Sequence, residues 1–213
     1  MKTLTLAHVE TAVRAMADTA LVNESYFSEL DGACGDGDFG ASLATGFRKL
    51  LEQWDELDRS SISAFLMKTS IVITSNVGGC SGPIWGTGFM RAATSARGKT
   101  TLALSDLVTM GRSAMEGMMA RGGAQLGDKT LLDALAPAIA RLAAAGPDDD
   151  LLAVWHEATA AATAAIEGTR HLTARRGRQS FTGDRSAGTL DPGIVGAATM
   201  MRAIGEALRN TEG

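Results

Sequence analysis

The sequence predicts an all-α protein, a single domain over residues 1–213 that contains about eight antiparallel helices. Apolar residues recur at steps of three and four along most of the chain, which places them on one face of each helix. Alanine is abundant, while aromatic residues make up only 5% of the 213 residues. Small side chains suit closely packed helices, whereas strands favour β-branched and aromatic residues.

The helical spacing occurs in eight separate segments. In chain order they are residues 9–20, 43–57 and 62–73, a helix that opens at Pro83, and residues 107–118, 132–142, 155–165 and 194–208. Most connections between them are short, so neighbouring helices should run antiparallel. The longest irregular stretch covers residues 175–192, and loops of that length in a compact domain are usually functional or mobile.

The predicted helix ends carry the residues that helix ends favour. Pro192 stands where a first helical turn tolerates the missing N–H. Thr130 with Asp133 three residues later resembles a capping box. Gly122-Gly123 is typical of a helix stop.

Composition excludes several classes of function. The formal net charge of −4 argues against a nucleic-acid partner, because such binding relies on positive charge to neutralise phosphates. No stretch is long and apolar enough to span a bilayer, so no membrane partner is expected. The two cysteines, Cys34 and Cys80, are too few for a disulfide scaffold and favour a reduced, cytoplasmic compartment.

The first unusual loop, residues 31–40, alternates carboxylates with glycines. Asp31, Asp36 and Asp38 lie among four glycines just before a strongly amphipathic helix. Glycine lets the backbone bend sharply, so these carboxylates could point at one centre and would then need a divalent cation such as Mg²⁺ or Ca²⁺. The plain alternative is a solvated turn that caps a helix. An EF-hand fails, because no twelve-residue frame from Asp31 or Asp36 ends on glutamate.

Two further glycine-rich loops differ in what they indicate. Residues 78–83 run through small residues into a helix start at Pro83, a pattern suited to binding a phosphate at free N–H groups, although a tight interhelical turn is the alternative. Residues 122–130 nearly match a phosphate-binding P-loop. Asp128 interrupts that motif before Lys129, and the loop follows a helix rather than a strand, so a P-loop is rejected.

The fourth loop, residues 175–188, is basic and rich in glycine and hydroxyl groups. Its arginines suit a phosphate clamp, because guanidinium presents a planar fork of donors. A solvated basic loop is the alternative. We expect a mobile lid that becomes ordered on nucleotide phosphates, with Arg178 as the first phosphate contact and Arg185 as the second.

Together the four loops resemble the L subunit, or nucleotide-binding domain, of dihydroxyacetone kinases. The matching segments are residues 30–40, 78–83, 127–135 and 177–193, in family order. The resemblance implies a barrel-like bundle of eight helices with a nucleotide site at one end, ATP or ADP as cofactor, and two Mg²⁺ ions. It implies that the metal ligands are Asp31, Asp36 and Asp38.

The resemblance also implies which residues contact the nucleotide. The phosphate loop corresponds to Gly79, Cys80 and Ser81, and the adenosine side corresponds to Gly122 and Thr130. Further contacts correspond to Phe39, Gly40, Ser42, Arg178, Arg185, Asp191, Pro192 and Gly193.

The function implied by this resemblance is that of a phosphotransferase subunit. It would transfer a phosphoryl group from bound ATP to a small ketose that a partner K subunit holds, and a phosphoryl-donor protein is a further expected partner. Phe39, Cys80 and Phe181 stand where the family commonly has His, Ala and Tyr, and these departures leave open dihydroxyacetone or a tetrulose as the substrate. Two alternatives remain: a fatty acid kinase-like nucleotide domain and an ADP-loaded regulatory binding module.

Overall fold

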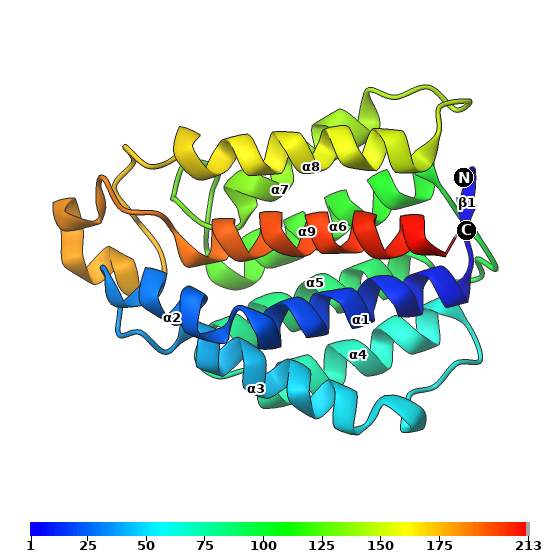
Figure 1. Ribbon diagram of the computed structural model, residues 1–213, viewed down its shortest axis with the longest axis horizontal. Helices are drawn as coiled ribbons and strands as arrows, with labels where there is room; N and C mark the ends of the chain where they lie inside the picture. The colour runs from blue at the N-terminus through cyan, green and yellow to red at the C-terminus, as the bar shows by residue number, and fades with distance from the viewer. Residues whose placement is uncertain (212–213) are drawn as a thin grey trace.

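The computed structural model describes residues 1–211, and within them nine α-helices run back and forth along one common direction (Figure 1). Their bounds are α1 Leu6–Val22, α2 Glu24–Gly32, α3 Phe39–Glu52, α4 Ile62–Asn76, α5 Ser81–Ser95, α6 Leu104–Gly122, α7 Leu132–Ala143, α8 Leu151–Gly168 and α9 Pro192–Asn210. Two 3₁₀ segments, η1 (Trp54–Glu56) and η2 (Arg178–Ser186), lie in connections.

Eight of these helices form a closed ring. Each packs against the next in the order α1, α3, α4, α5, α6, α7, α8 and α9, and α9 packs back against α1. The short helix α2 lies beside α3 and α9 at one end of the ring. The all-α prediction and the barrel-like bundle of eight antiparallel helices are therefore confirmed.

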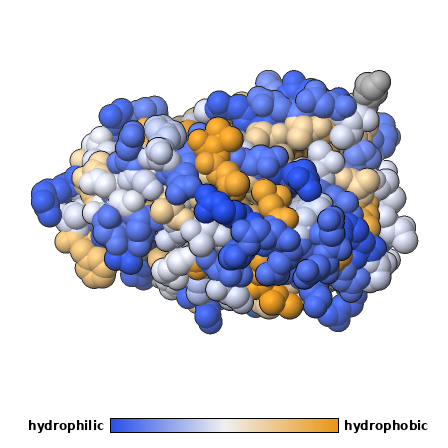
Figure 2. Space-filling model, turned by 60° about the horizontal axis from the view of Figure 1, so that its bottom comes forward, coloured by the Kyte–Doolittle hydropathy of each residue, from blue (hydrophilic) through white to orange (hydrophobic). Residues whose placement is uncertain are grey.

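The inner faces of the ring form the core. Large side chains such as Phe47 and Phe65 are fully buried there, as is Phe27 of α2, while Ala158 and Ala162 let α8 approach its neighbours closely. The outer face over α3 and α4 is mostly hydrophilic, with separate small groups of hydrophobic side chains (Figure 2). None of the helices within residues 1–211 combines the length and apolar character needed to cross a membrane.

Most predicted helix ends are confirmed. Helix α6 ends at Gly122, and Gly123 follows in the left-handed conformation with φ 59°. Pro192 is the first residue of α9. The Asp133 carboxylate accepts a hydrogen bond from the Thr130 backbone N–H at 2.9 Å. The Thr130 hydroxyl, however, accepts from the Leu132 N–H rather than from the Asp133 N–H. Only half of the capping box therefore forms.

Three local predictions need correction. Helix α2 was not predicted, because its polar sequence buries only Phe27 and Asp31 and so carries no apolar period. The helix predicted over 43–57 ends at Glu52 and continues as η1. The stretch 175–192, predicted to be irregular, contains the 3₁₀ turns of η2, which break at Gly183 with φ 57°.

The chain also forms a very small sheet that the sequence pattern did not indicate. Strand β1 (Thr3–Leu4) pairs antiparallel with β2 (Leu102–Ala103). Two-residue strands are too short to show a period of two. The sheet ties the N-terminus to the α5–α6 connection, at the end of the ring opposite α2 (Figure 1).

Candidate functional site

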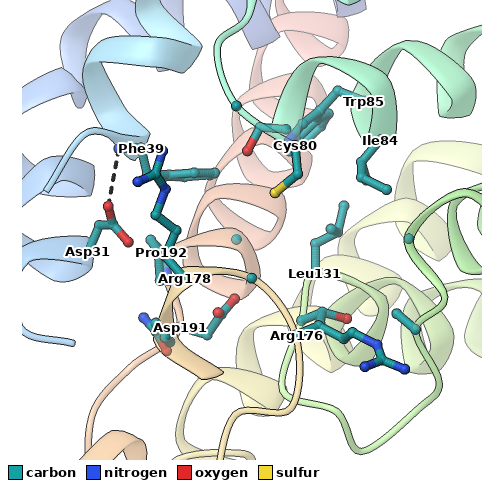
Figure 3. Close-up of a pocket in the computed structure, with 18 of the residues that line it drawn as sticks. Asp31, Phe39, Cys80, Ile84, Trp85, Leu131, Arg176, Arg178, Asp191 and Pro192 are labelled. Carbon is teal, nitrogen blue, oxygen red and sulfur yellow. Dashed lines mark hydrogen bonds between the residues drawn. The ribbon is translucent and has the colours of Figure 1, made fainter. Parts of the chain in front are cut away.

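A cavity of about 220 Å³ lies at the end of the ring where the connections α2–α3, α4–α5, α6–α7 and α8–α9 meet (Figure 3). All four loops singled out in the sequence therefore converge at one place. The predicted site residues that line this cavity are Asp31, Asp38, Phe39, Gly79, Cys80, Ser81, Gly122, Thr130, Arg178, Asp191, Pro192 and Gly193.

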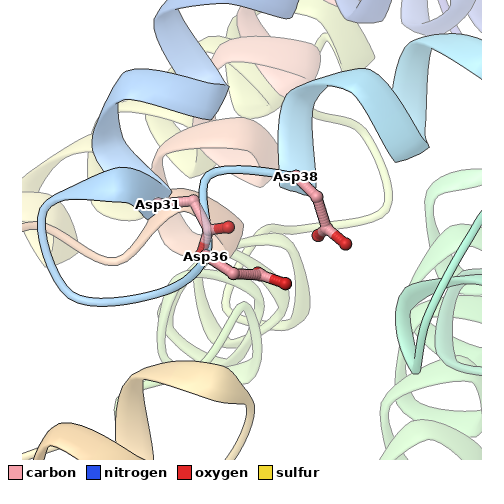
Figure 4. A group of neighbouring side chains, drawn as sticks. All are labelled: Asp31, Asp36 and Asp38. Atoms are coloured by element: carbon pink, nitrogen blue, oxygen red, sulfur yellow. The ribbon is translucent and has the colours of Figure 1, made fainter.

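The three carboxylates predicted to hold metal lie together (Figure 4). Asp31, Asp36 and Asp38 each offer one oxygen, and these oxygens all lie within 4.8 Å of one another. Asp31 is buried, while the other two are exposed. Burial raises the pKa of the Asp31 carboxyl, and the charges of Asp36 and Asp38 raise this pKa further. The cluster thus concentrates negative charge that a cation would relieve.

Local backbone geometry builds this cluster. Asp31 lies in the last turn of α2, not in the loop where the sequence placed it, and its carboxylate accepts a hydrogen bond from the Phe39 N–H at 3.3 Å. A Cβ at Gly35 would lie 2.2 Å from Asp31 Oδ1, so only glycine leaves room for the carboxylate. Gly37 turns the chain with φ 76°, a conformation that side chains disfavour.

This oxygen cluster fits Mg²⁺. Hard divalent cations take carboxylate oxygens, and Mg²⁺ in nucleotide sites is usually held by few protein carboxylates together with phosphates. Glycines at the turns leave space around the oxygens rather than filling it. Asp31, Asp36 and Asp38 are therefore the residues that could hold the ion.

Arg178, in the α8–α9 connection, pairs with two of these carboxylates. Its guanidinium forms an ion pair with Asp36 and lies 3.4 Å from Asp38 Oδ2. The arginine was expected to contact phosphate, and in this structure it offsets part of the carboxylate charge. Arg178 and Asp38 are about half exposed and Asp36 is 38% exposed, so the contact contributes little to folding stability.

The glycine loop before α5 faces the cavity from a third side. Gly79 has φ 62°, and nothing lies within 4 Å of the position a Cβ would take. Cys80 precedes α5, a helix of 15 residues whose N-terminus has free N–H groups and a positive dipole end. Open space in front of such a terminus suits a phosphate.

Apolar residues form the remaining wall, and sequence reasoning missed them. Trp85 and Met118 are buried, while Ile84 and Leu131 are partly buried beside them. The sequence pattern placed Met118 on an apolar helix face and did not single out Ile84, Trp85 or Leu131, and only the tertiary structure shows that all four border the cavity. Such a wall can accept the flat face of a base.

Asp191 begins α9 at the cavity wall. Its carboxylate accepts a hydrogen bond from the Ile194 N–H at 2.8 Å. Burial raises the pKa of Asp191 to about 7, although the Ile194 N–H and the charge of Lys129 act in the opposite direction. This carboxyl group therefore changes its charge near neutral pH.

Lys129 does not face the cavity. Its side chain is fully buried, and its ammonium donates to the backbone carbonyls of Arg170, Leu172 and Ser186. The amine is fully engaged inside the protein, and this supports the rejection of a P-loop. No signal in the sequence pointed to this structural use of the lysine.

Four of the predicted residues lie outside the cavity lining. Asp36 is exposed beside Asp31 and Asp38, and Ser42 lies next to the cavity residue Gly78, where a Cβ would be 2.7 Å from the Ser42 hydroxyl. Gly40 lies where a Cβ would meet the Glu24 carbonyl at 2.0 Å, so it serves the packing of α3 on α2. Arg185 is exposed, and its carbonyl accepts a hydrogen bond from the Cys34 thiol at 3.2 Å.

The cysteines are both free, as expected from the sequence. Cys34 is buried beside η2, and Cys80 is exposed at the cavity. Gln179, also at the cavity, was not predicted as a site residue. Its side-chain oxygen is buried without a hydrogen-bond partner.

Comparisons with known proteins identify relatives along most of the chain. The DAK2 domain family matches residues 33–206. The PEP-dependent dihydroxyacetone kinase, ADP-binding subunit DhaL, of Escherichia coli (strain K12) is 34% identical over 188 residues, which cover 88% of this chain and 90% of that protein. The L-erythrulose 1-kinase of Mycolicibacterium smegmatis is 33% identical over 208 residues, which cover 95% of this chain and 35% of that protein.

A solved structure has a similar fold. The dihydroxyacetone kinase from C. freundii in complex with AMP-PNP and Mg²⁺ superposes with a TM-score of 0.72 at 25% sequence identity, covering 94% of this chain and 34% of that one. This chain thus spans about a third of the length of that structure.

Proposed function

We propose that this chain, which belongs to the DAK2 domain family, is the nucleotide- and Mg²⁺-binding component of a kinase that phosphorylates a small ketose. A partner K-type subunit would hold the ketose. The observation that carries the proposal is the convergence of an acidic oxygen cluster, a glycine-rich helix N-terminus and an arginine on one cavity. The names of the relatives point to the same class of reaction.

Each wall of the cavity has a separate role in this proposal. Asp31, Asp36 and Asp38 would hold two Mg²⁺ ions, and these ions would neutralise charge on the phosphate oxygens. The N–H groups of residues 79–81 would bind phosphate, and the apolar wall around Trp85 would bind the base. Phosphoryl transfer needs such charge neutralisation and alignment more than covalent help from the protein.

The same carboxylates repel phosphate when no cation is present. Arg178 already pairs with Asp36 and Asp38, and it could turn from them to the terminal phosphate when the cation takes its place. The chain's own contribution would then be to hold and align the nucleotide, while the partner places the ketose hydroxyl in line with the phosphorus. The free thiols of Cys34 and Cys80 suit the reducing cytoplasm, where we place this kinase.

Two experiments test the function. Calorimetry should show that the purified chain binds ADP in Mg²⁺ and that EDTA weakens the binding strongly. The chain alone should phosphorylate dihydroxyacetone with ATP little or not at all, and a K-type partner should restore turnover. Robust turnover by the isolated chain would refute the need for a partner.

The acceptor and the donor are tested in the same reconstituted system. Dihydroxyacetone and L-erythrulose, compared by kcat/KM, separate the two substrates that the relatives' names suggest. Replacing ATP by ADP with a phosphoprotein donor tests whether bound ADP is recharged in place. Retention of ADP without turnover, even beside the partner, would favour the regulatory module instead.

A further inference from the structure

The segment that carries the cavity arginines, residues 170–188, has little regular structure of its own. We name it the arginine arm. Gly177 and Gly183 within it have φ values of 68° and 57°. Its 3₁₀ turns are a poor source of rigidity. Arg178 nevertheless stands opposite Asp38, which lies 140 positions earlier in the chain, so contacts outside the arm must set the position of the arm.

Lys129 joins the two ends of the arm. Its ammonium donates to the carbonyl oxygens of Arg170 at 3.2 Å, Leu172 at 3.0 Å and Ser186 at 2.6 Å. The first two acceptors precede the arginines and the third follows them. One charged group therefore closes the base of the arm, and the part with the arginines projects from that base toward the cavity.

The arm closes on itself at the same point. The Ser186 hydroxyl accepts a hydrogen bond from the Ala174 N–H at 2.8 Å and donates to the Gly183 carbonyl at 2.7 Å. The Gly188 N–H donates to the Arg170 carbonyl at 2.8 Å. The ends of the arm thus form a small collar around the lysine ammonium.

The residue before Lys129 adds a second link. The Asp128 carbonyl accepts from the Arg175 N–H at 3.0 Å, and the Asp128 carboxylate lies 3.7 Å from Arg176 Nε. That same Arg176 nitrogen donates to the Gly123 carbonyl at 2.7 Å. The α6–α7 connection therefore positions the arm through two successive residues.

The lysine occupies an energetically unfavourable place. It is fully buried, and burial lowers the pKa of its ammonium. Among residues 1–211 it is the one residue other than glycine with a positive φ, at 62°. A buried charge bonded to neutral carbonyls usually stabilises a fold less than a well-packed apolar side chain. Strain of this kind is retained mainly where a particular position is needed.

We propose that Lys129 is a positioning residue that fixes the base of the arginine arm, and thereby places Arg176 and Arg178 at the nucleotide cavity. Its consequence for the nucleotide rests on the proposed function, whereas the anchoring itself belongs to the nucleotide-free chain. The alternative is a lysine that only stabilises the fold as a whole.

The first test follows hydrogen exchange in the nucleotide-free chain. Lys129→Met keeps the length of the side chain but removes the donors. Exchange should rise at least about tenfold in residues 170–188, since hydrogen bonds to a charged group are among the stronger ones, and should stay near the wild-type rate in α4 and α5. Lys99→Met is the matched control, because Lys99 is half-exposed and pairs with Asp106 far from the arm. An equal rise along the whole chain would overturn the proposal.

The second test is a double-mutant cycle on Mg·ADP affinity with Arg178→Ala. If Lys129 acts by placing Arg178, the double variant should bind about as weakly as the weaker single variant. Losses that simply add would show that Lys129 acts independently, and would overturn the positioning role. Should Lys129→Met not fold, Ser186→Ala opens the same collar from the arm side, and the same two outcomes apply.

These measurements separate the two proposals. If the wild-type chain does not bind Mg·ADP, the proposed function fails while the exchange experiment still decides whether Lys129 anchors the arm. If the chain binds Mg·ADP but exchange in the arm is unchanged by Lys129→Met, the anchoring fails and the function stands.

Discussion

Two aspartates begin helices at opposite ends of the barrel, and they behave oppositely as acids. Asp150 accepts a hydrogen bond from the Ala153 N–H at the start of α8, and Asp191 accepts one from the Ile194 N–H at the start of α9. The N-terminal ammonium beside Asp150 holds its pKa below the usual range, whereas burial at the cavity raises the pKa of Asp191 to about 7. The same type of helix cap thus has a carboxyl group with a lowered pKa at one end of the barrel and one with a raised pKa at the other.

Backbone conformation divides the two ends in the same way. Within residues 1–211 the positive φ values fall at Gly37, Gly79, Gly98, Gly123, Gly127, Lys129, Gly177, Gly183 and Gly188. All of these except Gly98 lie in the four connections around the cavity. The opposite end is built from ordinary caps and turns. The comparison teaches that unusual conformations are concentrated where a ligand is expected, because only there is a close approach of backbone to ligand required.

The largest expected effect is the pH dependence of the two caps. The raised pKa of Asp191 means that its contribution to stability is present below about pH 4 and is lost as pH rises through about 7, by up to about 4 kcal/mol. Asp191→Asn keeps the cap and removes the titration. The free energy of unfolding of the variant minus that of the wild type should therefore rise between pH 4 and pH 7, measured by urea denaturation.

Asp150→Asn is the matched control and should show the opposite sign. Its lowered pKa contributes stability above the unfolded pKa, which is lost as pH falls through the folded pKa. The variant should thus be less stable than the wild type at neutral pH and approach it in acid. A difference for Asp191→Asn that is flat with pH would show that burial does not control this carboxyl group.

Asp36→Asn tests the metal assignment. The substitution preserves size and removes one charge from the cluster of three carboxylates. ADP affinity in Mg²⁺ should fall about a hundredfold, since even groups that only support a metal ligand contribute about 10–100-fold, and the difference from wild type should shrink in EDTA. Equal affinities of variant and wild type in Mg²⁺, measured by calorimetry, would remove Asp36 from the metal site.

Gly35→Ala and Gly98→Ala compare a glycine at each end. At Gly35 the new Cβ would lie 2.2 Å from Asp31 Oδ1, so the carboxylate must move and Mg·ADP affinity should fall about 10–100-fold. At Gly98, with φ 77° and open space around it, alanine should cost only about 1 kcal/mol of stability and leave affinity unchanged. Thermal unfolding and calorimetry on both variants check this. If Gly35→Ala binds Mg·ADP as tightly as the wild type, Gly35 is not needed to make room for the Asp31 carboxylate.

The smallest expected effect is on the stability of the nucleotide-free chain in Arg178→Ala. About half of the Arg178 side chain is exposed, so losing its ion pairs should change the free energy of unfolding by less than about 1 kcal/mol. Mg·ADP affinity should nevertheless fall measurably. Arg48→Ala is a control with a similarly exposed ion pair, to Glu24, and should leave affinity unchanged. A stability loss without an affinity loss would make Arg178 a structural residue.

Much of the fold and part of the site could be predicted from the sequence. Helix periodicity is a local property, so the eight long helices followed from spacing, and glycine and proline marked the end of one helix at Gly122 and the start of another at Pro192. The four loops were recognisable because glycine, aspartate and arginine stand out against an alanine-rich background. Helix α2 escaped prediction because it buries few apolar residues.

The mobile lid predicted over residues 175–188 stays a prediction, but the structure narrows it. Lys129 and Ser186 hold both ends of this segment, so any opening should be confined to the turns between Gly177 and Gly183. Hydrogen exchange with and without Mg·ADP tests this. Equal protection of those turns in both states would make them a fixed structural element.

By itself the sequence determined which segments become the eight long helices, which loops can bend sharply, and which chemical groups those loops carry. Only the tertiary structure decided which groups meet: Arg178 with Asp36 and Asp38, Lys129 with the ends of the arm, and Trp85 with the cavity. The physical reason is range. Secondary structure depends on neighbours within a few positions, whereas these contacts join residues far apart in the chain, whose distance is set by the closure of the eight-helix ring.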